Sequence, residues 1–327
     1  MSAHPLVVVD GISRYFGDLC AIDNLSIEVQ RGEIIGFLGP NGAGKSTTMQ
    51  IICGALAPSS GAVNIGGFDL FTEPRAAKNL IGYLPETPPL YPELTVDEYL
   101  DFTALLHGVA KAAMRDARER VKQRCAIAGS GKRLIRNLSK GYRQRVGIAQ
   151  AMIHNPQVVV LDEPTEGLDP NQMREIRALI QELGREHSVI LSTHLLPEVQ
   201  AVCHRVLIVN EGRLVFDQSL SNIDAITEGQ QQNGVAEPSN KSLRVRLSRP
   251  PPLKEWQNIT GVTGASLDSD QQILVEYLAE QTTIEQLSAK IVSSGWGLTE
   301  LSPNRQTLEE IFVRLTCGET VEQNSPD

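Results

Sequence analysis

Short apolar runs alternate with helical patterns along the N-terminal part of the chain. Uninterrupted runs at Ile34–Leu38, Val158–Leu161 and Val189–Leu191 have the length and composition of buried strands. Between the last two, apolar residues recur at positions i, i+3, i+4 and i+7, which predicts a helix with one face on the sheet. These positions are Ile176, Leu179, Ile180 and Leu183. Strands and helices that alternate in this order predict an α/β fold with a mainly parallel core sheet.

The segment from about Thr95 to Arg136 has a different pattern. The run from Thr95 to Glu98 is a capping box, in which the threonine and the glutamate together cap the start of a helix. The charged stretch that follows suits an exposed helix. We interpret the region of about 90–155 as a helical subdomain.

The character of the chain changes near Ile223. The stretch 223–241 is polar and turn-rich, which predicts a linker. Beyond it, residues 243–247 alternate as in a half-buried strand, Ile273–Val275 predicts another strand, and two helical patterns follow, the second introduced by the capping box Thr307–Glu310. We therefore expect a first domain at 1–222, a small α+β domain at 242–317 and a tail at 318–327.

Composition and charge exclude some classes of protein. The 30 Lys and Arg against 39 Asp and Glu give a formal charge of -9, which argues against a surface that coats nucleic acid. No apolar run approaches the ~18 to 20 residues that cross a bilayer, and the start lacks the features of a signal peptide, so we expect a cytoplasmic protein. The cysteines stand singly, which suggests neither a zinc site nor a disulfide framework.

The residues after the first apolar run match the P-loop pattern, in which a glycine-rich loop joins a strand to a helix. They are Gly39, Pro40, Asn41, Gly42, Ala43, Gly44, Lys45 and Ser46, with Thr47 next in the helix. Backbone N–H groups of such a loop and the helix N-terminus attract phosphate. Lys45 is expected to neutralise the β- and γ-phosphates, and the Ser46 hydroxyl to bind Mg²⁺. The motif predicts a nucleoside triphosphate with Mg²⁺ as the ligand.

Two acids, Asp162 and Glu163, end the apolar run Val158–Leu161. They emerge at the C-terminal edge of a buried strand, where α/β sheets bind their ligands. We expect Asp162 to hold Mg²⁺ through its water shell and Glu163 to act as the general base on the attacking water. Alone, the pair would also suit a solvated strand end, and the P-loop upstream favours the catalytic interpretation.

A further segment, Leu138-Ser139-Lys140-Gly141-Tyr142, lies shortly before the acidic pair. With the P-loop and the acids in this order, the chain resembles the ATP-binding cassette (ABC) family from about Leu6 to Phe216. The resemblance implies a P-loop NTPase of the ABC-cassette fold, with a mainly parallel core sheet, an antiparallel β part and a helical subdomain. It also implies ATP hydrolysis, and that Ser139 and Gly141 contact the γ-phosphate held by the opposite subunit. Ser139 is in addition a good N-cap for a helix.

The resemblance assigns other positions. Asp169 corresponds to the D-loop aspartate, and His194 to the switch histidine that contacts the γ-phosphate, which makes it a catalytic candidate with Glu163 and Lys45. Glu86 stands where most members have the glutamine that senses Mg²⁺ and faces the membrane partner. Phe16 occupies the position of the aromatic residue that stacks on adenine, and the neighbouring Tyr15 is the second candidate.

Three residues depart from the commonest family pattern: Glu86 replaces the glutamine, Lys140 a glycine and Tyr142 the terminal glutamine of the signature segment. None of these changes removes a catalytic group. Glu86 puts an extra carboxylate near Mg²⁺, which bears on metal binding and on its coupling to transport.

The segments around Glu86 and Ser139 resemble the branch that pairs with ABC-2-type permeases, which includes gliding-motility and drug- or polysaccharide-export subunits. Its members carry a small C-terminal domain ending as at Leu308–Phe312. The resemblance implies a homodimer, or a pair with another ABC subunit, that holds ATP between its halves and drives a separate transmembrane permease from the cytoplasmic face of the membrane. Export is the favoured direction, and the surface around Glu86 and the helical subdomain is the expected docking site.

Two other classes compete with the transporter interpretation. A soluble ABC ATPase that acts on DNA would carry a long coiled coil between Lys45 and Ser139, and one that acts on ribosomes would carry two cassettes; the sequence has neither feature. A P-loop kinase would explain the glycine loop but not the Ser139 segment. We expect no nucleic-acid partner.

Overall fold

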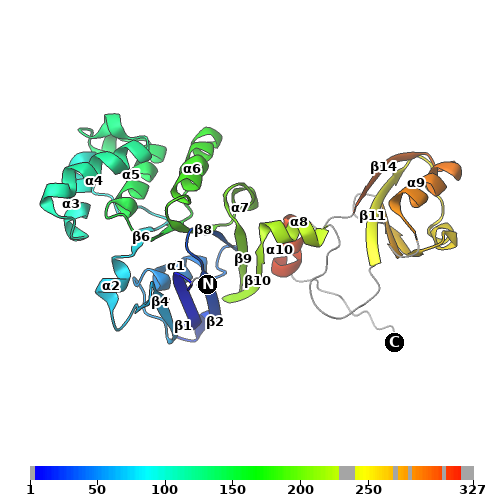
Figure 1. Cartoon of the computed structure of the whole chain (residues 1–327), viewed down its shortest axis with the longest axis horizontal. Helices are drawn as coiled ribbons and strands as arrows, with labels where there is room; N and C mark the ends of the chain where they lie inside the picture. The colour runs from blue at the N-terminus through cyan, green and yellow to red at the C-terminus, as the bar shows by residue number, and fades with distance from the viewer. Residues whose placement is uncertain (1–3, 228–239, 268–271, 279–281, 304–306, 318–327) are drawn as a thin grey trace. The chain divides into compact units, whose positions relative to one another are not determined.

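The computed structural model describes residues 4–227, 240–267, 272–278, 282–303 and 307–317. The chain divides into two compact units, drawn with their elements in Figure 1. The first comprises the residues up to Leu220 together with Phe312 and those after it, and the second comprises Ser221–Ile311. The sequence predicted a second domain at 242–317, whereas the second unit of the structure starts at Ser221 and ends at Ile311.

The core of the first unit is a six-stranded sheet with the order β10-β9-β3-β8-β7-β6. Five strands are parallel, and β10 is antiparallel to β9. The three strands predicted from apolar runs are confirmed as β3, β7 and β8, and every residue of each is buried. The strands are β3 (Ile34–Leu38), β6 (Ile81–Leu84), β7 (Val158–Asp162), β8 (Ser188–Thr193), β9 (Arg205–Asn210) and β10 (Arg213–Ser219).

A second, antiparallel sheet in this unit has the order β2-β1-β4-β5. Its strands are β1 (Val7–Phe16), β2 (Leu19–Val29), β4 (Ser60–Ile65) and β5 (Phe68–Asp69). The helix α1 (Lys45–Ile52) follows β3, and α2 (Pro74–Lys78) follows β5. Apolar side chains of both sheets and α1 form one buried cluster that includes Ile12, Met49 and Val160. This packing fixes the start of α1 against the ends of the parallel strands.

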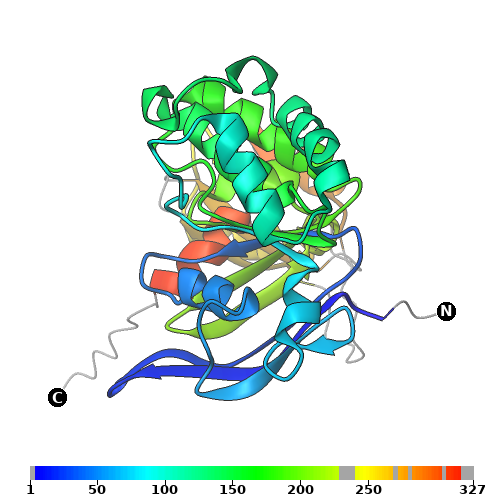
Figure 2. The same ribbon diagram turned by 90° about the vertical axis from the view of Figure 1, so that its left-hand side faces the viewer.

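The predicted helical subdomain consists of α3 (Val96–Leu106), α4 (Lys111–Arg124) and α5 (Lys140–Met152), with short 3₁₀ turns η1 (Ala128–Ser130) and η2 (Ile135–Asn137). Figures 1 and 2 show these helices on the opposite side of the core from the β1–β2 hairpin. The predicted capping box at Thr95 is confirmed, with both of its hydrogen bonds to Glu98 present. Half of the residues of α4 are exposed, whereas Ala117, Val121 and Lys122 are buried, so the exposed helix that the charge pattern predicted is confirmed only in part.

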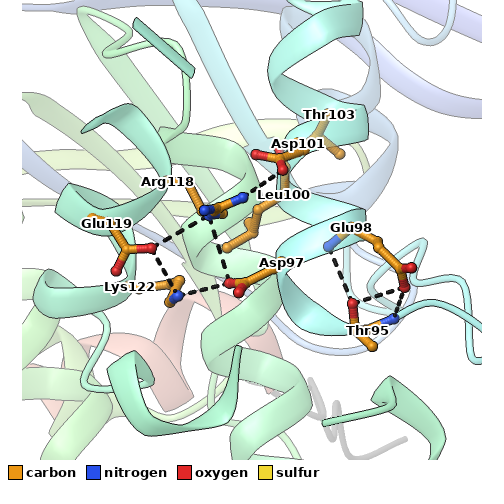
Figure 3. Close-up of polar contacts among 9 residues, drawn as sticks. All are labelled: Thr95, Asp97, Glu98, Leu100, Asp101, Thr103, Arg118, Glu119 and Lys122. Carbon is orange, nitrogen blue, oxygen red and sulfur yellow. Dashed lines mark hydrogen bonds and ion pairs between the residues drawn. The ribbon is translucent and has the colours of Figure 1, made fainter. Parts of the chain in front are cut away.

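Charged side chains join α4 to α3 (Figure 3). Lys122 is 4% exposed, and its Nζ lies 2.6 Å from Asp97 Oδ1 and 3.0 Å from Glu119 Oε1. Arg118 Nη1 lies 2.5 Å from Asp101 Oδ2, and Arg118 Nε lies 3.6 Å from Asp97 Oδ1. Ion pairs therefore connect the two helices.

Two helices of the first unit follow β7 and β8 along the chain, and a third helix starts at the boundary between the two units. The amphipathic pattern at 176–183 is confirmed in α6 (Pro170–Leu183), whose four predicted apolar residues are buried. It is followed by α7 (Leu196–Val202). The helix α8 (Leu220–Thr227) extends into the stretch that was expected to be a linker, because its apolar Ile223 is buried. The rest of that stretch up to residue 239 lies outside the described residues.

The second unit is built on an antiparallel sheet with the order β12-β13-β11-β14. The strands predicted at 243–247 and 273–275 are confirmed as β11 (Asn240–Leu247) and β13 (Ile273–Leu278), beside β12 (Val262–Leu267) and β14 (Leu298–Pro303). The helix α9 (Ile284–Ser293) and the 3₁₀ turn η3 (Leu253–Asn258) pack on it around the fully buried Trp256. The last helix, α10 (Leu308–Cys317), passes from the second unit to the first at Phe312. It starts at the predicted capping box, since Thr307 and Glu310 exchange both hydrogen bonds.

No helix in the described part of the chain is long and apolar enough to cross a membrane.

Candidate active site

The glycine loop between β3 and α1 has a backbone that only glycine suits at two positions. Gly44 is the N-cap of α1 with φ 101°, and a Cβ there would lie 2.7 Å from the carbonyl oxygen of Ala21. A Cβ on Gly39 would lie 2.4 Å from the carbonyl oxygen of Val209. The loop is thus pressed against β2 and β9 while the N–H groups at the start of α1 stay available to an anion.

Lys45 opens α1 and is 6% exposed. Its Nζ donates to the carbonyl oxygens of Gly39, at 2.9 Å, and Pro40, at 3.2 Å. It also lies 3.7 Å from Glu163 Oε1, so the loop lysine and the predicted general base form an ion pair. The positive charge is therefore already directed to the place where the loop would bind phosphate.

Ser46 and Asp162 meet across the gap between α1 and the end of β7. The Ser46 hydroxyl lies 3.3 Å from Asp162 Oδ1, and Asp162 is 1% exposed. Burial raises the pKa of Asp162, while the Ser46 hydrogen bond and the Lys45 charge act in the opposite direction. A buried carboxylate beside a hydroxyl provides the hard oxygen donors that Mg²⁺ prefers.

Glu163 has a left-handed backbone, with φ 46°, which is uncommon for a residue other than glycine. Its N–H donates to the carbonyl oxygen of Ser192 at 3.0 Å, which ties the end of β7 to β8. Its carboxylate lies 2.9 Å from Nδ1 of His194, the residue after β8. The structure therefore brings all three catalytic candidates, Lys45, Glu163 and His194, into one chain of contacts.

These groups border a cavity of about 570 Å³. Predicted residues along its wall come from the glycine loop, the acidic pair and the switch positions: Phe16, Asn41, Gly42, Gly44, Lys45, Ser46, Thr47, Glu86, Glu163 and His194. The other predicted loop residues, Gly39, Pro40 and Ala43, and the buried Asp162 support this wall from behind. The cavity is large enough for a nucleotide rather than for an ion alone.

Three lining residues were missed from the sequence: Leu19, Ala21 and Glu166. Leu19 and Ala21 reach the cavity because β2 turns back beside Phe16, and only the pairing register of β1 with β2 shows this. Glu166 lies in the loop after the acidic pair, and its charge beside that pair could have indicated that it belongs to the site.

Glu86 follows β6 and faces the same cavity. Burial raises its pKa, and the carboxylates of Glu166, Asp162 and Glu163 raise it further. The extra carboxylate of this chain thus lies in an acidic environment that a cation would relieve.

Phe16 ends β1 at the rim of the cavity and is 47% exposed. The guanidinium of Arg14 lies 4.6 Å from the centre of its ring, on which it makes a cation–π contact. Tyr15 is equally exposed but does not border the cavity. Of the two aromatic candidates, the geometry favours Phe16 for contact with a base.

Ser139, Gly141 and Asp169 do not line this cavity. Ser139 caps α5 and accepts from Tyr142 N at 3.4 Å, and Asp169 caps α6 by accepting from Asn171 N and Gln172 N. The starts of the two helices are packed together, since a Cβ on Gly141 would lie 2.6 Å from the Gln172 side chain. These three residues therefore lie outside the wall of the cavity in the same chain.

Comparison with known proteins identifies the family. A family model described as "ABC transporter" matches residues 22–166. The chain is 35% identical over 97% of its length, and 97% of the relative's, to "Uncharacterized ABC transporter ATP-binding protein YdbJ" of Bacillus subtilis. It is 29% identical to "Bacitracin transport ATP-binding protein BcrA" of Bacillus licheniformis, over 97% of this chain and 99% of that one. It is also 30% identical to "Daunorubicin resistance ATP-binding protein DrrA3" of Streptomyces coeruleorubidus, over 96% of each.

A solved structure described as "Structure of ATP binding subunit of ABC transporter" matches with a TM-score of 0.62 and 30% identity, over 68% of this chain and 93% of the other. The fold and the site define a P-loop ATPase of the cassette type. The chain belongs to the ABC transporter ATP-binding family. It is an ATP-binding, ATP-hydrolysing subunit, and members of this family dimerise and associate with a membrane permease.

Proposed function

We propose that two copies of this chain, or this chain and a paired ABC subunit, close on two ATP molecules. Each ATP would lie in the cavity of one subunit and would be covered by the Ser139 helix start of the other. The observation that carries this proposal is the separation of the two halves of the site: Lys45, Glu163 and His194 border the cavity, whereas Ser139 does not. Binding energy gained only in the closed pair would then drive the closing motion.

Within each site, the residues near the glycine loop fit Mg²⁺. The Ser46 hydroxyl and the Asp162 carboxylate would hold the ion, with Glu86 as a further oxygen donor from the opposite wall. When bound, Mg²⁺ offsets the charge that develops on the phosphates. Lys45 would turn from the loop carbonyls to the phosphate oxygens, which are stronger acceptors.

The chemistry assigned to Glu163 is the removal of a proton from the attacking water. The contact with His194 Nδ1 supports the direction of its carboxylate, and the same imidazole would contact the γ-phosphate. The Glu163 carboxylate would be released from Lys45 as the lysine moves to the phosphates.

Glu163→Gln tests both the site and the dimer. The variant keeps the shape of the side chain but removes its basicity, so we expect hydrolysis to fall at least about 100-fold while ATP binding persists. Gel filtration with saturating Mg-ATP should show a stable dimer. Adding Ser139→Arg to this variant should return it to a monomer without loss of ATP binding, because Ser139 is exposed and lies outside its own cavity. A monomer in the single variant would contradict the closed pair.

We further propose that the partner is a separate ABC-2-type permease, that the chain works at the cytoplasmic face of the membrane, and that the direction is export. The relatives' names support export, since they include "Nod factor export ATP-binding protein I" of Paraburkholderia xenovorans. On the helical subdomain, the exposed Tyr91 and Phe102 pack edge to face with ring centres 5.5 Å apart and offer an apolar docking surface. Co-purification from detergent-solubilised membranes should recover the permease; recovery of ribosomes or DNA alone would favour the soluble class.

A further inference from the structure

A buried carboxylate that the mechanism above does not use lies directly behind the catalytic groups. Glu198, in α7, is 1% exposed. One of its oxygens accepts a hydrogen bond from the hydroxyl of Thr165, and the other accepts from the hydroxyl of Thr193 at 2.8 Å. A guanidinium nitrogen of Arg177, from α6, lies 3.8 Å from the first oxygen. The carboxylate thus connects three segments that are distant in the sequence.

Both threonines adjoin a catalytic candidate. Thr193 is the residue before His194, and its hydroxyl also accepts from the N–H of Leu195 at 3.0 Å, so the backbone on each side of the histidine is fixed. Thr165 lies two residues after Glu163 in the loop that leaves β7. The two hydroxyls are almost wholly enclosed, with Thr165 2% exposed and Thr193 0% exposed.

Glu163 and His194 need such a connection. The left-handed φ of Glu163 is a conformation that persists only where surrounding contacts enforce it. The 2.9 Å contact between its carboxylate and His194 joins two loops, and catalytic groups must keep their relative positions within a fraction of an ångström. The nearest backbone hydrogen bond, from Glu163 N to Ser192 O, reaches β8 itself, and no backbone hydrogen bond between the two loops is seen among the described residues.

We propose that Glu198 is a positioning residue for ATP hydrolysis. Its carboxylate joins the loop after β7 to the loop after β8 through Thr165 and Thr193, and so sets the position of Glu163 relative to His194. A carboxylate suits this task because it accepts from two hydroxyls at once, whereas an amide presents one acceptor and one donor. The proposal rests on the proposed catalytic roles of Glu163 and His194.

The test compares Thr193→Val and Glu198→Gln with the wild-type full-length chain. Valine keeps the shape of threonine without the hydroxyl, and glutamine keeps the shape of glutamate with one acceptor fewer. Both variants should lower kcat about 10-fold or more while KM for ATP and the Kd of Mg-ATP change less than about twofold, because the nucleotide-binding residues are untouched. Thr193→Ser, which restores the hydroxyl, should recover most of kcat.

A matched control is Thr103→Val, which removes a buried hydroxyl that donates to the carbonyl oxygen of Leu100 in α3. Thr103 is not among the residues that line the cavity. The variant should keep kcat. A loss as large as that of Thr193→Val would overturn the proposal, since it would show that any lost buried hydroxyl slows hydrolysis. So would a Thr193→Ser variant as slow as Thr193→Val.

The double variant, Thr193→Val with Glu198→Gln, should be no slower than the worse single variant, because both changes break the same connection. Losses that multiply would overturn the proposal. If a variant fails to fold, Thr165→Val tests the same carboxylate from its other partner. Glu163→Gln separates the proposed role of Glu198 from the proposed role of Glu163. If Glu163→Gln hydrolyses ATP at the wild-type rate, the assignment of Glu163 as the base is wrong. If Glu163→Gln is inactive while Thr193→Val and Glu198→Gln are both fully active, only the role of Glu198 is wrong.

Discussion

At the scale of single residues, the site depends on side chains whose positions are set by neighbours that do not touch the ligand. Phe16 is an example: its ring is exposed at the rim of the cavity, and Arg14 covers part of it through a cation–π contact. The arrangement orients one ring face before ATP binds, which lowers the entropy lost on binding.

The adjacent residue provides a matched test of this role. Phe16→Ala should weaken ATP binding by about 1 to 3 kcal/mol, the range of one base–aromatic stacking contact, which corresponds to roughly a 5- to 150-fold rise in Kd. Tyr15→Ala removes an aromatic ring of equal exposure that does not border the cavity, so its Kd should stay within about twofold of the wild type. Fluorescent-nucleotide titration would measure both, and an equal loss in the two variants would show that the base does not stack on Phe16.

At the scale of elements, the sequence predicted best those segments whose neighbours bury them completely. The strands β3, β7 and β8 were visible because every residue in them is buried, and the P-loop because its glycines have no substitute in that conformation. The pairing of β1 with β2, which brings Leu19 to the cavity, was not predictable, because it depends on register shifts along the hairpin.

Contacts between elements were equally hidden from the sequence. The role of Glu198 could not be predicted, since nothing in the neighbouring sequence shows that its carboxylate accepts from two threonine hydroxyls. The cavity-lining Glu166 was missed for the same reason, although it stands close to the acidic pair. Helix ends were better predicted, because the capping boxes at Thr95 and Thr307 are local interactions.

The connection of α3 with α4 is a testable feature at this scale. Lys122→Met removes the cation that lies 2.6 Å from Asp97 and fills the same space with an apolar side chain. We expect a loss of about 1 to 3 kcal/mol in the free energy of unfolding, less than for a fully buried pair, because Asp97 keeps Arg118 and is partly exposed. Arg246→Met breaks an exposed pair with Glu300 and should cost less than about 0.5 kcal/mol in the second unit. Thermal unfolding of the two variants measures both losses in the free energy of unfolding. Equal losses would contradict a structural role for the α3–α4 ion pairs.

At the scale of the whole molecule, the two units offer separate reporters. All residues that line the nucleotide cavity belong to the first unit. The chain has 2 tryptophans, Trp256 and Trp296, and both belong to the second unit, with their ring centres 5.1 Å apart and Trp256 fully buried. Tryptophan fluorescence therefore follows the unfolding of the second unit, whereas far-UV circular dichroism follows mainly the larger first unit.

We expect ATP to separate the two unfolding transitions. A ligand that binds only the folded form stabilises the unit that binds it, by about 2.7 kcal/mol at 100 times Kd, which for a unit of this size raises its Tm by roughly 5 to 10 °C. Saturating ATP with the inactive Glu163→Gln variant should therefore shift the circular dichroism transition upward and leave the tryptophan transition within about 1 °C of its ligand-free value. Adding Phe16→Ala should reduce the shift at the same ATP concentration, because it raises Kd. A tryptophan transition that rises together with the first would mean that the two units unfold as one cooperative body, and that the second unit senses whether ATP is bound.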